Sequence, residues 1–166
     1  MTADSDNRED LARLYREVIK AHAANPVGYR QIIEATHRHE AYNPLCGDRV
    51  EIAMRVRRNC IEAAAFDGEA CAICMASASL LCSLAPGRTT SGLRELSEGL
   101  DHALEGGTEF IREDSRMNSV LREDPSRDMP PKIPADLRPL LGVRPYPSRI
   151  RCATLPWDAA LKALAD

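Results

Sequence analysis

The chain has 166 residues, of which 44% are hydrophobic, and this size and composition favour one domain spanning residues 1–166 with its own core. A formal net charge of −3 and a pI near 5.8 argue against nucleic acid or an acidic membrane as the partner. The polar N-terminus carries no apolar signal segment, and no window has the length of a bilayer span, so we expect a soluble, cytoplasmic protein.

The first predicted element is an amphipathic helix, because apolar side chains recur at helical spacing from Leu11 to Ile19. Asp6 and Glu9 have the spacing of a capping box at its start. Asn25 and Pro26 end it, since proline cannot continue the helical hydrogen bonds. We therefore expect a helix of about four turns.

Three strands are expected next. Residues 50–56 alternate apolar and polar side chains, and residues 60–68 follow after a short polar interruption, a pattern typical of an antiparallel hairpin. Residues 34–42 predict a third strand before the hairpin, although they contain few β-branched residues.

The second half of the chain predicts helices. Residues 71–84 are apolar or small at nearly every position, as in a buried central helix. Leucines from Leu93 to Leu104 indicate an amphipathic helix closed by Gly106 and Gly107. Together these elements predict an α+β fold, in which a small antiparallel three-stranded sheet packs against several helices.

The region between the amphipathic helix and the C-terminal helix is expected to be irregular. Charges alternate with Met and Pro at about residues 112–134, so we expect a flexible insertion with at most a short helix. Thr154 is then predicted to cap a final helix that carries Pro156 in its first turn.

Six cysteines without an export signal favour metal binding or thiol chemistry over disulfides. Cys60 and Cys82 are expected to pack in the core. Three of the remaining cysteines stand at predicted element boundaries, namely Cys46, Cys71 and Cys152. Cys71 and Cys152 are both predicted to lie at helix N-termini, where the helix dipole favours thiolate.

Two ligand sets are compatible with the cysteine spacing. In the first, Gly47 allows Cys46 and Asp48 to approach one ion together with Cys71 and Cys152, giving a tetrahedral shell of three thiolates and one carboxylate. In the second, four cysteines bind the metal and Cys74 takes the place of Asp48. Residues three apart share a helix face, so Cys74 is alternatively a resolving thiol for Cys71 or a packed core residue.

The sequence around these cysteines resembles the NifU N-terminal/IscU-type iron–sulfur assembly family, most closely its SufU-like branch. Three cysteine motifs occur in the family's order, each beside its expected neighbours, and together with the N-terminal match they cover nearly the whole chain outside the insertion. The matching segments are residues 14–26, Asn43-Pro44-Leu45-Cys46-Gly47-Asp48-Arg49, residues 68–71 with 75–79, and residues 149–155.

The resemblance implies a metal site and a reaction. It implies that Cys46, Asp48, Cys71 and Cys152 bind Zn²⁺, or a transient [2Fe–2S] cluster in scaffold relatives. It further implies that Cys46 accepts persulfide sulfur from a PLP-dependent, SufS-like cysteine desulfurase, whose histidine replaces Cys46 on the zinc. Arg149 matches a basic family position that would support the persulfide, and a downstream SUF-type assembly scaffold would receive the sulfur.

Several features distinguish the branches of this family. Scaffold relatives carry a Leu-Pro-Pro-Val-Lys motif and a histidine before the third cysteine, whereas this chain has residues 144–148 without that motif and Arg151 at the histidine position. These differences favour a zinc-dependent sulfurtransferase over a [2Fe–2S] scaffold or a domain in which zinc is purely structural. Cys74 departs from the serine usual in the SufU-like branch, so a second thiol is expected one turn from a ligand.

Overall fold

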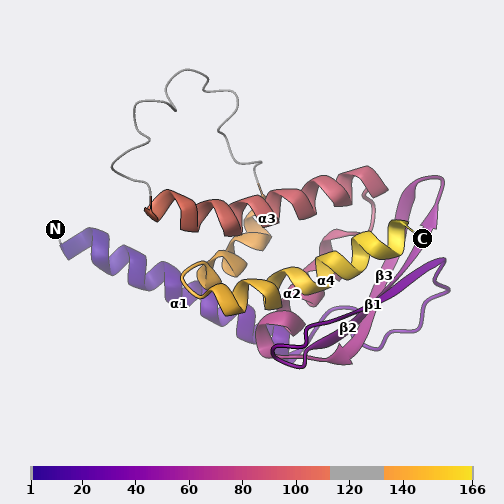
Figure 1. The fold of residues 1–166 in the computed structure, drawn as a ribbon, viewed down its shortest axis with the longest axis horizontal. Helices are drawn as coiled ribbons and strands as arrows, with labels where there is room; N and C mark the ends of the chain where they lie inside the picture. The colour runs from indigo at the N-terminus through magenta and orange to yellow at the C-terminus, as the bar shows by residue number, and fades with distance from the viewer. Residues whose placement is uncertain (1, 113–132, 166) are drawn as a thin grey trace, which may run out of the picture.

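The protein is an α+β fold in which helices pack on a three-stranded antiparallel sheet, as the sequence predicts (Figure 1). The structure is a computed structural model, and it describes residues 2–112 and 133–165. The strands are β1 (His37–Tyr42), β2 (Arg49–Arg57) and β3 (Cys60–Glu69). The helical elements are α1 (Thr2–Ala24), α2 (Ala72–Leu84), α3 (Thr90–Arg112), the 3₁₀ helix η1 (Ala135–Val143) and α4 (Pro147–Ala165).

The sheet has the strand order β1-β2-β3, with β2 in the centre. Arg58 and Asn59 link β2 to β3 with positive φ angles of 52° and 64°, as required at both central positions of a tight two-residue hairpin turn. The predicted hairpin is therefore confirmed. The predicted third strand is also present as β1, and it begins at His37 rather than at residue 34.

The strand register brings three segments together at one end of the sheet. Arg49, the first residue of β2, pairs with Tyr42 at the end of β1 and with Glu69 at the end of β3. The loop of residues 43–48 and the connection from β3 to α2 therefore leave the sheet at the same end. Both segments carry residues of the predicted metal site.

Helix α4 lies between α3 and the sheet, and it packs on α2, β1 and β2 (Figure 1). The side chain of Trp157 on α4 is fully buried, and the rest of the core is mainly aliphatic and alanine-rich. Helix α2 is buried along most of its length, as its composition predicts. Small side chains on α2 and α4 allow these two helices to pack closely.

The predicted start of the last helix is wrong. Helix α4 begins at Pro147, so Thr154 lies inside the helix and Pro156 follows in its third turn. Proline is well suited to the first position of a helix because its missing N–H is not needed there. Cys152 is consequently an interior residue of α4 and not, as predicted, a residue at the helix N-terminus.

Two other predicted helix ends are also wrong. Helix α1 begins at Thr2, so Asp6 and Glu9 lie within the helix and not at its start, where a capping box is found. Helix α3 continues through Gly106 and Gly107 to Arg112. A glycine inside a helix costs about 1 kcal/mol relative to alanine but does not forbid the helix.

The predicted flexible insertion at about residues 112–134 falls almost entirely outside the described residues. Residues 133–134, at its C-terminal end, lead into η1, a 3₁₀ helix that was not predicted from the sequence. None of the helices in the described ranges is both long and apolar enough to cross a membrane.

Candidate metal centre

The loop that precedes β2 is built around Asn43. The Asn43 side chain accepts a hydrogen bond from the backbone N–H of Leu45 at 3.1 Å, and its carbonyl accepts the N–H of Gly47 at 2.8 Å. The Asn43 N–H donates to the carbonyl of Asp48 at 2.8 Å. Since asparagine readily closes such local turns, these bonds fold residues 43–48 into a compact loop. The loop places Cys46 at its tip and Asp48, two residues later, at its base.

Gly47 supplies the backbone conformation that this loop requires. Its φ is +79°, in the left-handed region where a side chain is disfavoured. The turn at Gly47 leaves Cys46 exposed while Asp48 is buried, with 5% of its surface accessible. The Cys46-Gly47-Asp48 triplet is therefore a defined turn, in which the thiol is exposed and the carboxylate is buried.

Cys71 is the N-cap residue of α2, at the edge of the sheet where β3 ends. Its backbone N–H donates a hydrogen bond to Oδ1 of Asp48 at 2.9 Å. The Cys71 side chain makes no capping hydrogen bond, so the helix N-terminus does not require the thiol. The prediction that Cys71 lies at a helix N-terminus is thus correct.

Cys152 reaches the same place from α4. Its side chain is 1% exposed, and its Sγ lies 3.8 Å from the carbonyl oxygen of Ser148 one turn earlier. The next residue, Ala153, accepts a 2.5 Å hydrogen bond at its carbonyl from Ser77 on α2. Ser77 in turn accepts a 3.0 Å hydrogen bond from the indole N–H of Trp157. This buried network holds the Cys152 segment of α4 against α2.

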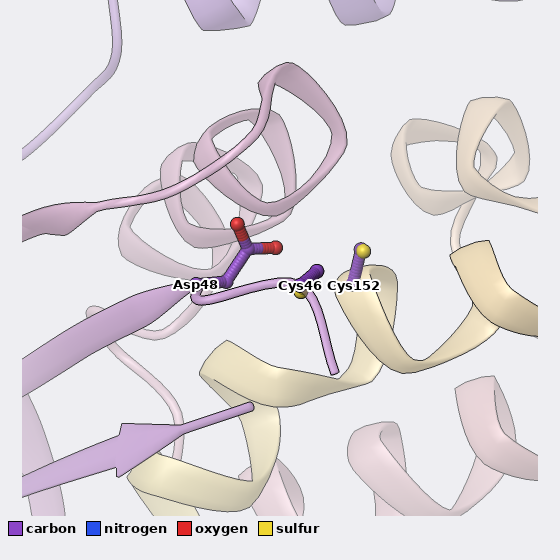
Figure 2. A group of neighbouring side chains, drawn as sticks. All are labelled: Cys46, Asp48 and Cys152. Carbon is purple, nitrogen blue, oxygen red and sulfur yellow. The ribbon is translucent and has the colours of Figure 1, made fainter. Parts of the chain in front are cut away.

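The loop of residues 43–48 and helix α4 bring a set of ligand atoms together. Cys46, Asp48 and Cys152 each offer one ligand atom, and these atoms all lie within 4.8 Å of one another. Figure 2 shows Cys46 and Asp48 on the loop leading into β2, with Cys152 on the neighbouring helix α4. The Cys71 thiol is not part of this group at that distance, although it interacts with both Asp48 and Cys152 and borders the group.

The electrostatics of the group depend on its burial. Burial, followed by the nearby Cys71 thiol and Asp48 carboxylate, raises the pKa of the Cys152 thiol to about 12. Burial also raises the pKa of Asp48, but the Cys46 thiol and the Cys71 N–H outweigh it and leave the pKa below its ordinary value. The Asp48 carboxylate is thus kept ionised, and a nearby cation would favour the thiolate form of the neighbouring cysteines.

A tetrahedral divalent cation fits this donor set. Oδ2 of Asp48 is buried and has no hydrogen-bond partner within the described residues, so it is an acceptor without a donor. Zn–S distances of about 2.3 Å put tetrahedral ligand atoms roughly 3.7 Å apart, so a group within 4.8 Å needs only small side-chain movements. Cys46, Asp48 and Cys152 with the bordering Cys71 would then supply four ligands.

The remaining predicted site residues lie around this group. Cys74 is fully buried in α2, where burial raises its pKa, with added repulsion from neighbours that include Asp48 and Cys71. Arg149 is exposed on the first turn of α4, three residues before Cys152. Cys82 is buried and Cys60 half-buried, in keeping with the expected packing role.

Two residues that organise the site were missed by the sequence analysis. Asn43 forms the loop, and its position before proline and three residues before Cys46 is a turn pattern that would have indicated this role. Ser77 connects α2 to α4, and no local pattern distinguishes it from the other small residues of α2. Its role depends on α4, which lies far away in the sequence.

Comparison with known proteins identifies relatives along almost the whole chain. The zinc-dependent sulfurtransferase SufU of Bacillus subtilis (strain 168) is 32% identical over 156 residues, covering 94% of this chain and 92% of SufU. The iron–sulfur cluster assembly scaffold protein IscU of Streptococcus pyogenes serotype M1 is 26% identical over 154 residues, covering 93% of this chain and 84% of IscU.

A solved structure shares the fold. FiSufU from the thermophile Fervidobacterium islandicum AW-1 superposes with a TM-score of 0.66 at 22% identity, covering 89% of this chain and 94% of FiSufU. At this identity the likeness shows the fold alone.

The fold and the cysteine–aspartate group define a class of small α+β proteins whose curated relatives are named for iron–sulfur cluster assembly and zinc-dependent sulfur transfer. The NifU-like N terminal domain family matches residues 14–107. The chain belongs to that family, which confirms the resemblance identified from the cysteine motifs.

Proposed function

We propose that this chain is a zinc-dependent sulfurtransferase of iron–sulfur cluster biogenesis, with Zn²⁺ bound by Cys46, Asp48, Cys71 and Cys152. The observation that carries the proposal is that the residues of the ligand group differ in solvent exposure. Asp48 and Cys152 are almost fully buried, whereas Cys46 is exposed at the tip of its loop. The Cys46 thiol is therefore accessible to a partner protein, whereas the Cys152 thiol and the Asp48 carboxylate remain inside.

Each residue has a separate part in this proposal. Bound zinc would stabilise the thiols as thiolates and lower the pKa that burial raises at Cys152. Asp48 would hold both the metal through Oδ2 and the first turn of α2 through Oδ1. Arg149, which is exposed near Cys152, would attract the anionic persulfide as the family resemblance implies.

The transfer is a thiol exchange that needs no external oxidant. The Cys46 thiolate attacks the terminal sulfur of a persulfide on the active cysteine of a PLP-dependent cysteine desulfurase. The new S–S bond forms on Cys46 as the donor S–S bond breaks, and the donor cysteine leaves as a thiolate. Cys46 then carries the persulfide for delivery to a downstream assembly scaffold.

The second candidate function is a scaffold on which a [2Fe–2S] cluster is assembled. The observation that favours it is the 26% identity with the scaffold protein IscU over most of both chains. The same four side chains would bind the cluster, since thiolates are the usual ligands of iron–sulfur clusters. The higher identity with SufU and the accessible Cys46 support the transferase instead.

Metal analysis combined with a desulfurase assay tests the proposal. We expect the purified protein to hold about one zinc per chain, as a single four-ligand site requires. It should stimulate a SufS-like desulfurase, and Cys46→Ala should lose the stimulation while staying folded. Cys60→Ala is the matched control, because Cys60 is half-buried at the opposite end of β3 from the site.

The possible outcomes separate the candidate functions. Normal stimulation by Cys46→Ala would show that Cys46 is not the sulfur acceptor. Iron and sulfide incorporation with a visible chromophore would instead support the scaffold. Zinc binding without any effect on desulfurase turnover would indicate that the metal only holds the fold together.

A further inference from the structure

We propose that Cys71 and Cys74 form a reversible disulfide under peroxide, with Cys74 as the resolving thiol that protects Cys71 from irreversible oxidation. The release of metal that accompanies this reaction rests on the proposed zinc site. The disulfide itself does not, because it needs only the two thiols of α2.

The first turn of α2 places the two cysteines on one side of the helix. The Met75 N–H donates to the Cys71 carbonyl at 2.9 Å, which closes a helical turn around the residues between them. Cys71 is the N-cap and Cys74 is the third residue of the helix. A Cys-X-X-Cys pair at a helix N-terminus is an arrangement in which thiol–disulfide chemistry is favourable.

The distance between the two side chains is within reach of a disulfide. Side chains three residues apart on a helix have Cβ atoms about 5–6 Å apart, while a disulfide needs roughly 3.5–4.5 Å. Cys71 can make up the difference, because its backbone is extended (φ −67°, ψ 167°) and its side chain makes no capping hydrogen bond. The Asp48 carboxylate already caps the Cys71 N–H, so moving the thiol breaks no cap.

The exposure of the two thiols fits the order of reaction. Cys71 is half-buried and can meet a small oxidant, whereas Cys74 has no accessible surface and lies in the hydrophobic core beside it. The half-buried thiol is oxidised first, and the buried thiol then attacks it from within the same helical turn. This order keeps Cys74 reduced until it is needed.

The reaction balances with hydrogen peroxide as the oxidant. The Cys71 thiolate attacks one peroxide oxygen, the O–O bond breaks, and the products are Cys71 sulfenic acid and, after protonation, water. The Cys74 sulfur then attacks the sulfenic sulfur, forming the S–S bond and releasing the second water. Two thiols have lost two electrons, and one peroxide has become two waters.

The chain contains a specific way to detect this bond. Trypsin cleaves after Arg58 and Arg88, so Cys71 and Cys74 stay in one peptide, 59–88, while Cys46 and Cys152 fall in others. A disulfide between Cys71 and Cys74 lowers the mass of this peptide by two hydrogens. A bond from Cys46 or Cys152 would instead link two peptides.

The experiment treats zinc-loaded and metal-free protein with hydrogen peroxide, follows zinc release with a chromophoric chelator and maps the peptides. We expect wild-type protein to lose two hydrogens in peptide 59–88, to release its zinc and to rebind about one zinc per chain after dithiothreitol. In Cys74→Ser, Cys71 should gain two oxygens as sulfinic acid, and dithiothreitol should not restore zinc binding.

Further variants keep the test specific. Peptide 59–88 also contains Cys60 and Cys82, so Cys60→Ser and Cys82→Ser should each still show the loss of two hydrogens. Cys74→Ala provides a second version of the substitution if serine in the core impairs folding, which thermal unfolding of both variants would reveal.

The outcomes distinguish this inference from the proposed function. Peptides linked through Cys46 or Cys152, or full recovery of zinc binding in oxidised Cys74→Ser, would overturn the role of Cys74. Protein that binds no zinc but forms the disulfide would refute the metal site and leave the disulfide standing. Zinc binding without any disulfide would do the reverse.

Discussion

Oδ1 of Asp48 accepts the backbone N–H of Cys71 at 2.9 Å, so one carboxylate joins the loop before β2 to the first turn of α2. Its other oxygen, Oδ2, is buried without a hydrogen-bond partner among the described residues. The two oxygens therefore have different roles, because one holds the protein together and the other is available to a cation. A substitution can separate them.

Asp48→Asn should impair metal binding more than folding. The amide oxygen can still accept the Cys71 N–H, but the neutral side chain loses the charge that attracts the metal. We expect zinc affinity to fall by more than the roughly 10–100-fold typical of a lost outer-shell partner. Competition with a chromophoric chelator measures the affinity, and an unchanged value would remove Asp48 from the ligand set. Asp67→Asn, which alters an exposed carboxylate paired with Arg30, is the control.

Gly47→Ala and Gly87→Ala form a matched pair that tests the loop. Both glycines have positive φ, +79° and +88°, and a Cβ at either position meets no atom within 4 Å. The left-handed conformation should therefore cost each variant about 1–2 kcal/mol in unfolding free energy. We expect weaker zinc binding for Gly47→Ala alone, because it lies between Cys46 and Asp48. Equal zinc affinities in chelator competition would show that the loop conformation does not matter to the site.

Local patterns predicted most of the fold but only part of the site. The hairpin and the buried helix α2 follow from alternation and composition, which act within a few residues. The Cys46-Gly47-Asp48 turn is equally local. Cys152 joins that turn from α4, about a hundred residues later, and spacing alone left it among several cysteine sets. Residue spacing carries no information on which distant helix packs beside a loop, and the family resemblance supplied that selection.

The helix ends show the opposite limitation. Thr154 has the residue type of an N-cap, yet it lies inside α4, where its hydroxyl donates to the Arg151 carbonyl at 3.4 Å. Pro156 is also accommodated inside the helix, which begins at Pro147. Burial of this face of α4 against α2 and the sheet outweighs the local preferences for a later start. Local helix-capping preferences therefore gave the wrong position for Cys152, which lies inside α4 and not at its N-terminus.

Ser77→Ala should destabilise the contact between α2 and α4. The Ser77 hydroxyl donates to the Ala153 carbonyl and accepts the Trp157 indole N–H, and all of these groups are buried. Removing it leaves the indole N–H without a partner, which typically costs about 1–3 kcal/mol. Urea unfolding should show this loss. Ser83→Ala is the control, since this residue is exposed and its hydroxyl bonds to the Ser79 carbonyl of the preceding turn, and equal stabilities would contradict the network.

Asp101 on α3 should make the protein less stable as the pH rises from 5 to 7.5. Its pKa is raised to about 6, first by burial and then by Asp158 on α4 and by Glu105 and Glu98 on α3, with Arg151 opposing the shift. The unfolded carboxyl titrates near 3.9, so the stabilising effect of the neutral form is complete below that pH and is lost as the pH rises through about 6. Asp101→Asn should remove this dependence and be the more stable protein at pH 7.5. Urea unfolding of both proteins at intervals across this range measures the difference, which isolates Asp101 because every other titratable group is common to the two proteins. Parallel stability curves for the two proteins would show that the Asp101 carboxyl does not titrate there.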